Sequence, residues 1–366
     1  MLLSITALGY PSPIFISWGD EEKADPYTQG LATVGGILKY LRKLPEGRED
    51  DLVLIVDGYD AWFQLRPDVI ISRYYDIIKT QTERLVDRFD RLEGSRVLQE
   101  HGVKQSIIFG ADKTCWPENP RRPACWAVPQ SPLPRWAFGP ETDSGKFREH
   151  NRPRWLNSGT VIGPVGDLIK LFEATVDRIK NAQSGVFSDQ FHISNLFGRQ
   201  ELARYMLNEW SPARLMADPP SLKKEVWISD DYHGGGHFEN ITLDVPYLDP
   251  AEDHEFHMTI DYESQLFQIN SYHWKYLDWF AYDHSTYDGR LALPDEINTT
   301  TLRNSFDRQL HFDLPEDILA SPPPFPSIGE RQPPTLRAQD PSRDPRPTGL
   351  EPVSYTHLTL PTKRIV

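Results

Sequence analysis

Two aspartates at the end of an apolar run have the spacing to hold a cation. In the stretch DDLVLIVDGYD, the run Leu52 to Val56 leads directly into Asp57, and Asp60 follows across a glycine and a tyrosine. Hard carboxylate oxygens at a tight turn suit Mg²⁺ or Mn²⁺, which complete their coordination shell with water and the phosphates of a ligand. The other interpretation of the D-x-x-D pattern is a solvated turn that an aspartate caps.

The segments around these aspartates alternate between strand-like and helix-like patterns. Strand-like runs occur at 13–18, 52–56, 105–112 and 155–164. Helical spacing of apolar residues occurs at 29–44, 69–91 and 166–182. This rhythm predicts an α/β domain with a mixed, mostly parallel sheet flanked by helices. Ligands of such open sheets bind at the carboxyl ends of the strands, where Asp57 and Asp60 would lie.

The composition changes twice toward the C-terminus. From Glu209 to Leu293 the apolar segments are shorter and rich in aromatic residues, which predicts an antiparallel extension. After Ser321 the chain is proline-rich and charged, and it cannot bury enough apolar surface to fold. We therefore expect one domain over 1–320 and a disordered tail over 321–366. The last stretch, VSYTHLTLPTKRIV, fits no element of the pattern and is interpreted as an appended, artefactual sequence.

Charge and hydropathy argue against two classes of partner. The net charge is −14, and no Lys/Arg cluster follows an expected helix face, so we expect no nucleic-acid partner. No apolar run is long enough to span a bilayer. The start, MLLSITALGYP, is too short and lacks the basic residues of a signal peptide, so a membrane anchor would belong to a longer form of the protein.

Two cysteines, Cys115 and Cys125, flank a proline-rich loop in TCWPENPRRPACW. A disulfide between them would imply an oxidising compartment. The alternative is a pair of reduced cysteines beside a tryptophan-rich core. Two Asn-x-Thr sites, at Asn240 and Asn298, favour a secreted or luminal protein.

Several segments resemble, in the same order, the motifs of a known enzyme family. They are VGGILK, VDGYD, GADKTCWP, RWLNSGTVIG, SDQFH and IDYESQLFQ. Together they resemble the glycosyltransferase domain of procollagen lysyl hydroxylases, and more closely its uncharacterised fungal relatives, over roughly residues 1–280. The resemblance implies a GT-A-like, Rossmann-like fold. It also implies metal-dependent transfer of a sugar from a UDP-sugar to a hydroxyl of a glycan or protein, in the lumen of the Golgi or endoplasmic reticulum.

The resemblance also implies roles for single residues. Asp57 and Asp60 would bind Mn²⁺ or Mg²⁺, and Tyr59 would stack on the nucleotide base. Asp189 and Gln190 would contact the donor sugar or the acceptor hydroxyl, with Asp189 as a base or as a stabiliser of positive charge. The further donor-binding residues would be Lys39, Trp116, Asn157, Ser158, Gly159, Asp261 and Gln268.

Some of these residues have a structural interpretation beside the functional one. Lys39 fits a solvated helix face, Trp116 fits core packing beside the cysteines, and Asp261 fits a structural or second-layer role. The family places a third metal ligand in a His-Gly-Asn-Gly-like segment that this chain lacks, and His311 is the only late histidine in a strand-like context. A non-catalytic relative that binds nucleotide or glycan is therefore the alternative function.

Three short motifs predict competing chemistry. HGGG at 233–236 resembles an esterase oxyanion hole, but the chain has no Gly-x-Ser-x-Gly nucleophile elbow. HFD at 311–313 has the His-x-Asp spacing of an iron oxygenase, but its only later histidine lies in the suspect tail, so we expect no hydroxylase activity. HEFH at 254–257 lacks the spacing of a zinc-binding His-Glu-x-x-His helix.

Overall fold

The protein is described here by a computed structural model. The described residues are 1–16, 26–58, 61–89, 94–119, 121–182, 188–209, 223–229, 238–246, 248–249 and 252–273. Tyr59 and Asp60 lie outside this described part, as do the HGGG segment, His311 and the expected tail.

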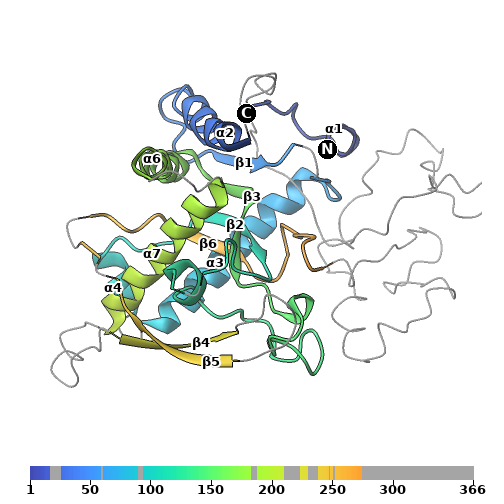
Figure 1. Cartoon of the computed structure of the whole chain (residues 1–366). Coiled ribbons are helices and arrows are strands. Elements are labelled where there is room, and N and C mark those ends of the chain that lie inside the picture. The colour runs from blue at the N-terminus through green and yellow to red at the C-terminus, as the bar shows by residue number, and fades with distance from the viewer. Residues whose placement is uncertain are drawn as a thin grey trace, which may run out of the picture.

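A mixed sheet of four strands stands at the centre of the fold (Figure 1), in the order β1-β3-β2-β6. Its strands are β1 (Leu52–Val56), β2 (Ile107–Asp112), β3 (Trp155–Pro164) and β6 (Met258–Asp261). Strand β3 is antiparallel to both of its neighbours, whereas β2 and β6 are parallel. The expectation of mostly parallel pairing is therefore wrong, because β3 enters in the opposite direction between β1 and β2. An apolar run indicates a buried strand but does not reveal the strand's direction.

Helices cover both faces of this sheet, as expected. They are α1 (Leu2–Ala7), α2 (Pro26–Leu41), α3 (Pro67–Arg88), α4 (Gly94–Glu100), α5 (Pro123–Trp126), α6 (Val165–Asn181) and α7 (Asp189–Glu209), with the 3₁₀ turn η1 (Arg148–His150). The expected helices correspond to α2, α3 and α6, with their ends shifted by a few residues. The expected strand at 13–18 is wrong for residues 13–16, which have no strand conformation.

Successive residues of the strands point to two separate cores, as the two-residue period of a strand requires. Ile107 and Phe109 belong to the core that α2, α6 and α7 cover, whereas Ile108 between them belongs to the core beneath α1 and α3. Figure 1 shows α7 and α3 on opposite sides of the sheet. Burial on both faces explains why β1 and the first half of β2 are apolar without interruption.

The expected antiparallel extension is correct only in part. Strands β4 (Lys223–Ser229) and β5 (Phe238–Asp244) pair antiparallel, but they form a separate two-stranded sheet. Strand β6, from the same region of the sequence, instead joins the central sheet parallel to β2. Among the described helices, none has both the length and the apolar composition that a membrane crossing requires.

Candidate functional site

Strand β3 interrupts its pairing with β2 close to the end of β1. Phe109 pairs with Val161, but the next residue, Gly110, pairs with Asn157, so residues 158–160 form a bulge on the β2 side. The Gly159 carbonyl in this bulge accepts a hydrogen bond from the backbone N–H of Asp57 at 2.9 Å. A bulge of this kind bends a strand and redirects its side chains. Here it places the Asn-Ser-Gly segment beside the carboxyl end of β1.

The side chain of Asp57 lies directly against Gly159. A Cβ atom at Gly159 would lie 2.9 Å from Oδ2 of Asp57 and 3.1 Å from Oδ1 of Asn157, so these two oxygens are no more than about 6 Å apart. Asp57 itself is exposed. The absence of a side chain at Gly159 therefore leaves room for a solvent-facing carboxylate at the strand end that the sequence predicts.

Asn157 links this bulge to the end of β2. Its Oδ1 accepts the N–H of Gly159 at 2.9 Å, and its side chain also hydrogen-bonds to the carboxylate of Asp112. Burial raises the pKa of the Asp112 carboxyl, while the N–H groups of Lys113 and Thr114 and the Asn157 side chain oppose that shift. The sequence shows Asp112 only as an acid at a strand end, and its link to Asn157 becomes visible in the structure.

The first turn of α7 meets the same bulge. Oε1 of Gln190 lies 3.4 Å from the backbone N–H of Ser158, which donates to it. Asp189 is the first residue of α7, where a carboxylate interacts favourably with the helix dipole. The structure thus brings Gln190 to the Asn-Ser-Gly segment, with Asp189 as its neighbour in the chain.

A loop closed by a disulfide follows β2. Cys115 and Cys125 are bonded, with their Cα atoms 5.3 Å apart, so the reduced alternative is wrong for this structure. Nε1 of Trp155 donates to the Cys125 carbonyl at 3.0 Å, which ties the loop to β3. Trp116 inside the loop is 53% exposed, so it does not pack in the core. A fixed loop therefore presents an aromatic face to solvent.

Helix α7 also holds this loop. Arg122 donates to Oδ1 of Asn195 at 3.0 Å and to Oγ of Ser194 at 2.9 Å. The approach is close, because a Cβ at Gly198 would lie 2.2 Å from the backbone nitrogen of Ala124. The loop is therefore fixed by its disulfide, by β3 and by α7.

Lys113 is a buried lysine that sequence reasoning missed. Its side chain is 0% exposed, its Nζ donates to the Glu149 carbonyl at 2.5 Å, and the same nitrogen lies 3.3 Å from the centre of the Phe138 ring. Burial lowers the pKa of Lys113 to about 6, against the opposing charges of the acids around it. Lysine is almost always exposed, so no local pattern signals such a position.

Two expected donor-binding residues, Lys39 and Asp261, do not contact the bulge. Lys39 is exposed on α2, and no contact among the described residues joins it to Asp57 or Asn157. Asp261 is 1% exposed, and its carboxylate accepts backbone N–H groups of the turn after β6, from Gln265, Leu266 and Phe267. This geometry corresponds to the structural interpretation of Asp261.

Gln268 belongs to the same turn as Asp261. It is half-buried and donates to the carbonyl of Ile269 at 2.9 Å. The Ile269 side chain lies where a Cβ at Gly110 would fall, at 2.7 Å. The same Cβ position lies 2.7 Å from Oγ1 of Thr160 in the bulge, so the residue after Gln268 packs against β2 beside the bulge.

Only some of the expected metal ligands lie within the described residues. No group of three or more His, Cys, Asp or Glu side chains with metal-site geometry occurs within the described residues, and Asp60 lies outside them. Asp57 offers an exposed hard oxygen, and an amide oxygen of Asn157 lies within about 6 Å of it. Carboxylate and amide oxygens are the chemistry that Mg²⁺ and Mn²⁺ select, so the residues present fit such an ion.

No protein-family model matches the chain, and no curated protein matches it either. The fold of the described residues, taken from the structure itself, is a mixed α/β arrangement with helices on both faces of the sheet.

Proposed function

We propose that the protein is a metal-dependent glycosyltransferase with a GT-A-like fold, which moves a sugar from a UDP-sugar to a hydroxyl acceptor. The observation that carries the proposal is the meeting of two strand ends and a bulge. Asp57 follows β1, Asp112 ends β2, and Asn157 in β3 contacts the groups beside both. An exposed carboxylate beside a glycine at the carboxyl edge of a sheet suits a cation that carries a diphosphate.

The metal site would consist of Asp57 and Asp60. A bound Mn²⁺ or Mg²⁺ would neutralise the diphosphate leaving group. The residues of the protein supply the geometry: Gly159 lets a ligand approach the Asp57 carboxylate closely, and the Asn157 amide keeps the bulge in place.

Aromatic residues would bind the nucleotide base. Trp116 is exposed on the disulfide loop after β2, and Tyr59 follows β1 in the sequence. By analogy with base stacking elsewhere, each such ring contributes about 1–3 kcal/mol. Because the loop is tied to both β3 and α7, little ordering of Trp116 would be needed on binding.

The sugar and acceptor side of the site would be formed by the bulge and the first turn of α7. The Ser158 hydroxyl can hydrogen-bond to a sugar hydroxyl, while Gln190 fixes the Ser158 backbone. Asp189, at the start of α7, is the candidate base for the acceptor hydroxyl. The disulfide favours an oxidising compartment, so we place the activity in the lumen of the secretory pathway.

Thermal unfolding with UDP and Mn²⁺ tests donor binding, because a ligand that binds only the native state must raise the melting temperature. The Asp57→Asn variant should lose this rise. Its matched control is Asp76→Asn, which changes an exposed carboxylate on α3 and should keep the rise. An equal rise in the protein and in Asp57→Asn would contradict the metal site.

Hydrolysis of a panel of UDP-sugars then separates the two functions. Release of UDP that depends on Mn²⁺ and is lost in Asp189→Asn supports a transferase. UDP binding without turnover of any sugar would instead favour the non-catalytic alternative, a protein that binds nucleotide or glycan.

A further inference from the structure

A pocket lies between α6, α7 and residues 252–256. Its volume is about 650 Å³, and we call it the α6–α7 pocket. Its wall includes the apolar side chains of Phe191, Leu196 and Phe256. His192 also lines it, and His192 is rotated by roughly 200° from Gln190 around the helix axis at about 100° per residue. Gln190 and His192 thus use different faces of α7, whereas Asp189 lies three residues before His192 on the same side of the helix and acts on its charge.

The acidic residues that line this pocket have basic partners. The pairs are Asp177 with Lys180 at 3.4 Å, Glu252 with Arg199 at 2.9 Å, and Asp253 with Lys170 at 2.6 Å. Each acidic residue that lines the pocket therefore has a basic partner. Of the two arginines that line it, Arg199 is paired in this way.

The other arginine, Arg178, makes no hydrogen bond or ion pair with the part of the chain that the structure describes, and its Nε is buried without a partner. His192 is only 2% exposed, and its ring contacts the Phe191 edge without a hydrogen-bond partner among the described residues. Burial lowers the pKa of Arg178 and the nearby Arg199 lowers it further, whereas the Glu252 carboxylate opposes this shift. Carboxylates also line the pocket, but no described residue hydrogen-bonds to Arg178 or to the His192 ring.

A purely structural interpretation does not account for these two residues. Arg178 lies in the last turn of α6, where a cation interacts favourably with the helix dipole. Lys180 in the same turn is exposed and already supplies a cation for this interaction with the helix dipole. The dipole gives no reason to bury the Arg178 Nε without a partner.

We propose that the α6–α7 pocket binds a small organic carboxylate with an apolar body, which Arg178 and His192 recognise at the carboxylate and Phe191, Leu196 and Phe256 enclose at the body. A planar guanidinium matches the two oxygens of a carboxylate, and a neutral imidazole can donate a further hydrogen bond. Because Arg199 is paired with Glu252, Arg178 is the only lining arginine among the described residues without an ion pair, and one such cation matches a singly charged carboxylate better than a doubly charged phosphate. This assignment does not depend on the glycosyltransferase proposal.

Titration of the full chain with benzoate and with benzamide, followed by NMR, tests the pocket. The two probes share an apolar ring, but only benzoate carries the carboxylate. Benzoate should bind saturably and at least about tenfold more tightly than benzamide, which corresponds to about 1.4 kcal/mol. Arg178→Gln should lower benzoate affinity by a similar factor, whereas Lys180→Gln, in the same helix turn, should leave it unchanged.

Three results would overturn the proposal. They are equal affinity for benzoate and benzamide, unchanged benzoate affinity in Arg178→Gln, and phosphate binding as tight as benzoate binding. If Arg178→Gln fails to fold, the probe comparison in the unmodified protein still decides. UDP–Mn²⁺ binding should persist in Arg178→Gln, so the failure of one site can be told from the failure of the other.

Discussion

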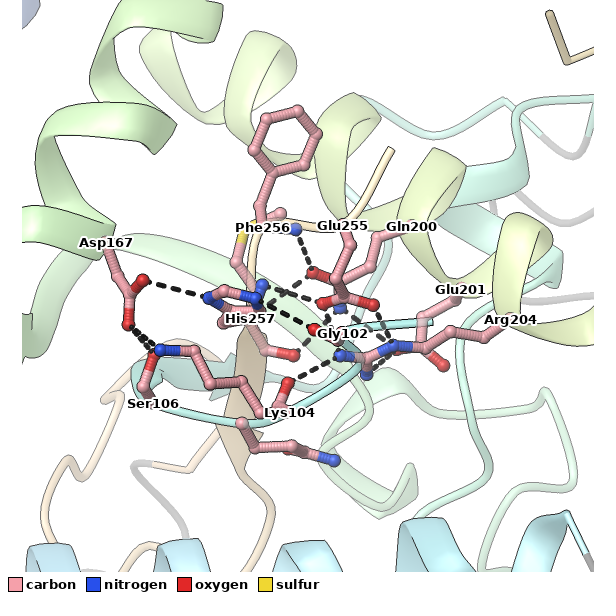
Figure 2. A network of polar contacts seen from close by, with 12 residues as sticks. Gly102, Lys104, Ser106, Asp167, Gln200, Glu201, Arg204, Glu255, Phe256 and His257 are labelled. Carbon is pink, nitrogen blue, oxygen red and sulfur yellow. Dashed lines mark hydrogen bonds and ion pairs between the residues drawn. The ribbon is translucent and has the colours of Figure 1, made fainter. Parts of the chain in front are cut away.

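Charged side chains are arranged differently at the two ends of the strands of the central sheet. At the carboxyl end of β1, Asp57 is exposed beside a bulge that breaks the regular pairing of β3. At the other edge, where β2 and β6 begin, buried and half-buried charged groups and the exposed Lys104 are joined in a continuous network (Figure 2). We infer that the network holds the fold, whereas the bulge edge is arranged for a partner from outside the chain.

Arg204 is the centre of one half of this network. Its side chain is 1% exposed and lies 2.8 Å from Glu201 and 2.7 Å from Glu255. It also donates to the Lys104 carbonyl at 2.9 Å. Although burial acts to raise it, the pKa of the Glu201 carboxyl is lowered, because Arg88 and Arg204 supply positive charge.

Asp167 is the centre of the other half. It accepts from Ser106 at 2.5 Å and Lys104 at 3.0 Å, and its Oδ1 lies 2.9 Å from Nδ1 of His257. Although burial acts to raise the pKa of Asp167, the hydrogen bonds from His257, Ser106 and Lys104 lower it overall. Figure 2 shows these side chains pointing toward one another at the start of β2 and β6.

The largest expected effect comes from breaking the network at Arg204. Arg204→Met leaves the half-buried Glu255 without its cation and the buried Glu201 with Arg88 alone, so we expect a loss of about 3–5 kcal/mol in the free energy of unfolding. Arg42→Met removes an exposed pair with Glu173 and should cost less than about 1 kcal/mol. Urea denaturation compares the two, and equal losses would mean that the network is not the structural anchor.

At the bulge edge the expected effect is on binding. A Cβ at Gly159 would lie 2.9 Å from Oδ2 of Asp57, the mobile end of a side chain, so Gly159→Ala should move the carboxylate at little cost in stability. We expect UDP–Mn²⁺ affinity to fall by about tenfold or more, measured by calorimetry. The control is Gly35→Ala on α2, which meets no atom within 4 Å. A Gly159→Ala variant that binds as the parent does would remove Gly159 from the site.

Acid should weaken the network at Asp167. Its folded pKa is below the unfolded value of about 3.9, so its stabilising contribution is present above about pH 4 and is lost as the pH falls through the folded pKa. Asp167→Asn should lower stability by about 1 kcal/mol at pH 7 and reduce the loss between pH 4 and 2. Denaturation at several pH values measures this, and identical slopes in both proteins would contradict it.

The smallest effect is spectroscopic and concerns Lys113. Its side-chain carbon signals should titrate with a midpoint near pH 6, and these signals should be absent from Lys113→Met. Because the unfolded chain keeps this proton to a higher pH, the free energy of unfolding should rise with pH above 6. A midpoint in the ordinary range of lysine would show that water reaches the Nζ.

Periodicity predicted the elements whose burial follows a simple pattern. The apolar run 52–56 and the helical spacing in α2, α3 and α6 correspond to what the structure contains. Helix α7 was missed because it is buried on several sides. Its buried residues include Ile193, Leu202, Gln200, Glu201 and Arg204, so it has no single apolar face.

The candidate site was predictable at Asp57 but not in its connections. An acid after an apolar run marks a strand end in the sequence itself. The bulge depends on how β3 aligns with β2, and the burial of Asp112 and Lys113 depends on the distant loop that covers them, with Glu149 and Phe138. Such relations between segments leave no local pattern.

Helix α7 carries a consequence for how variants will combine. Gln190 in its first turn meets the bulge, and Arg204 lies 14 residues later, about 21 Å along the helix at 1.5 Å per residue. Effects at that separation normally add, unless both residues belong to one rigid body. Because the buried pairs of Arg204 fix the rotation of α7 about its own axis, they also set the direction in which Gln190 points. A variant in which the Arg204 pairs are loosened would therefore let α7 rotate, and Gln190 would lose its position at the bulge before the protein unfolded.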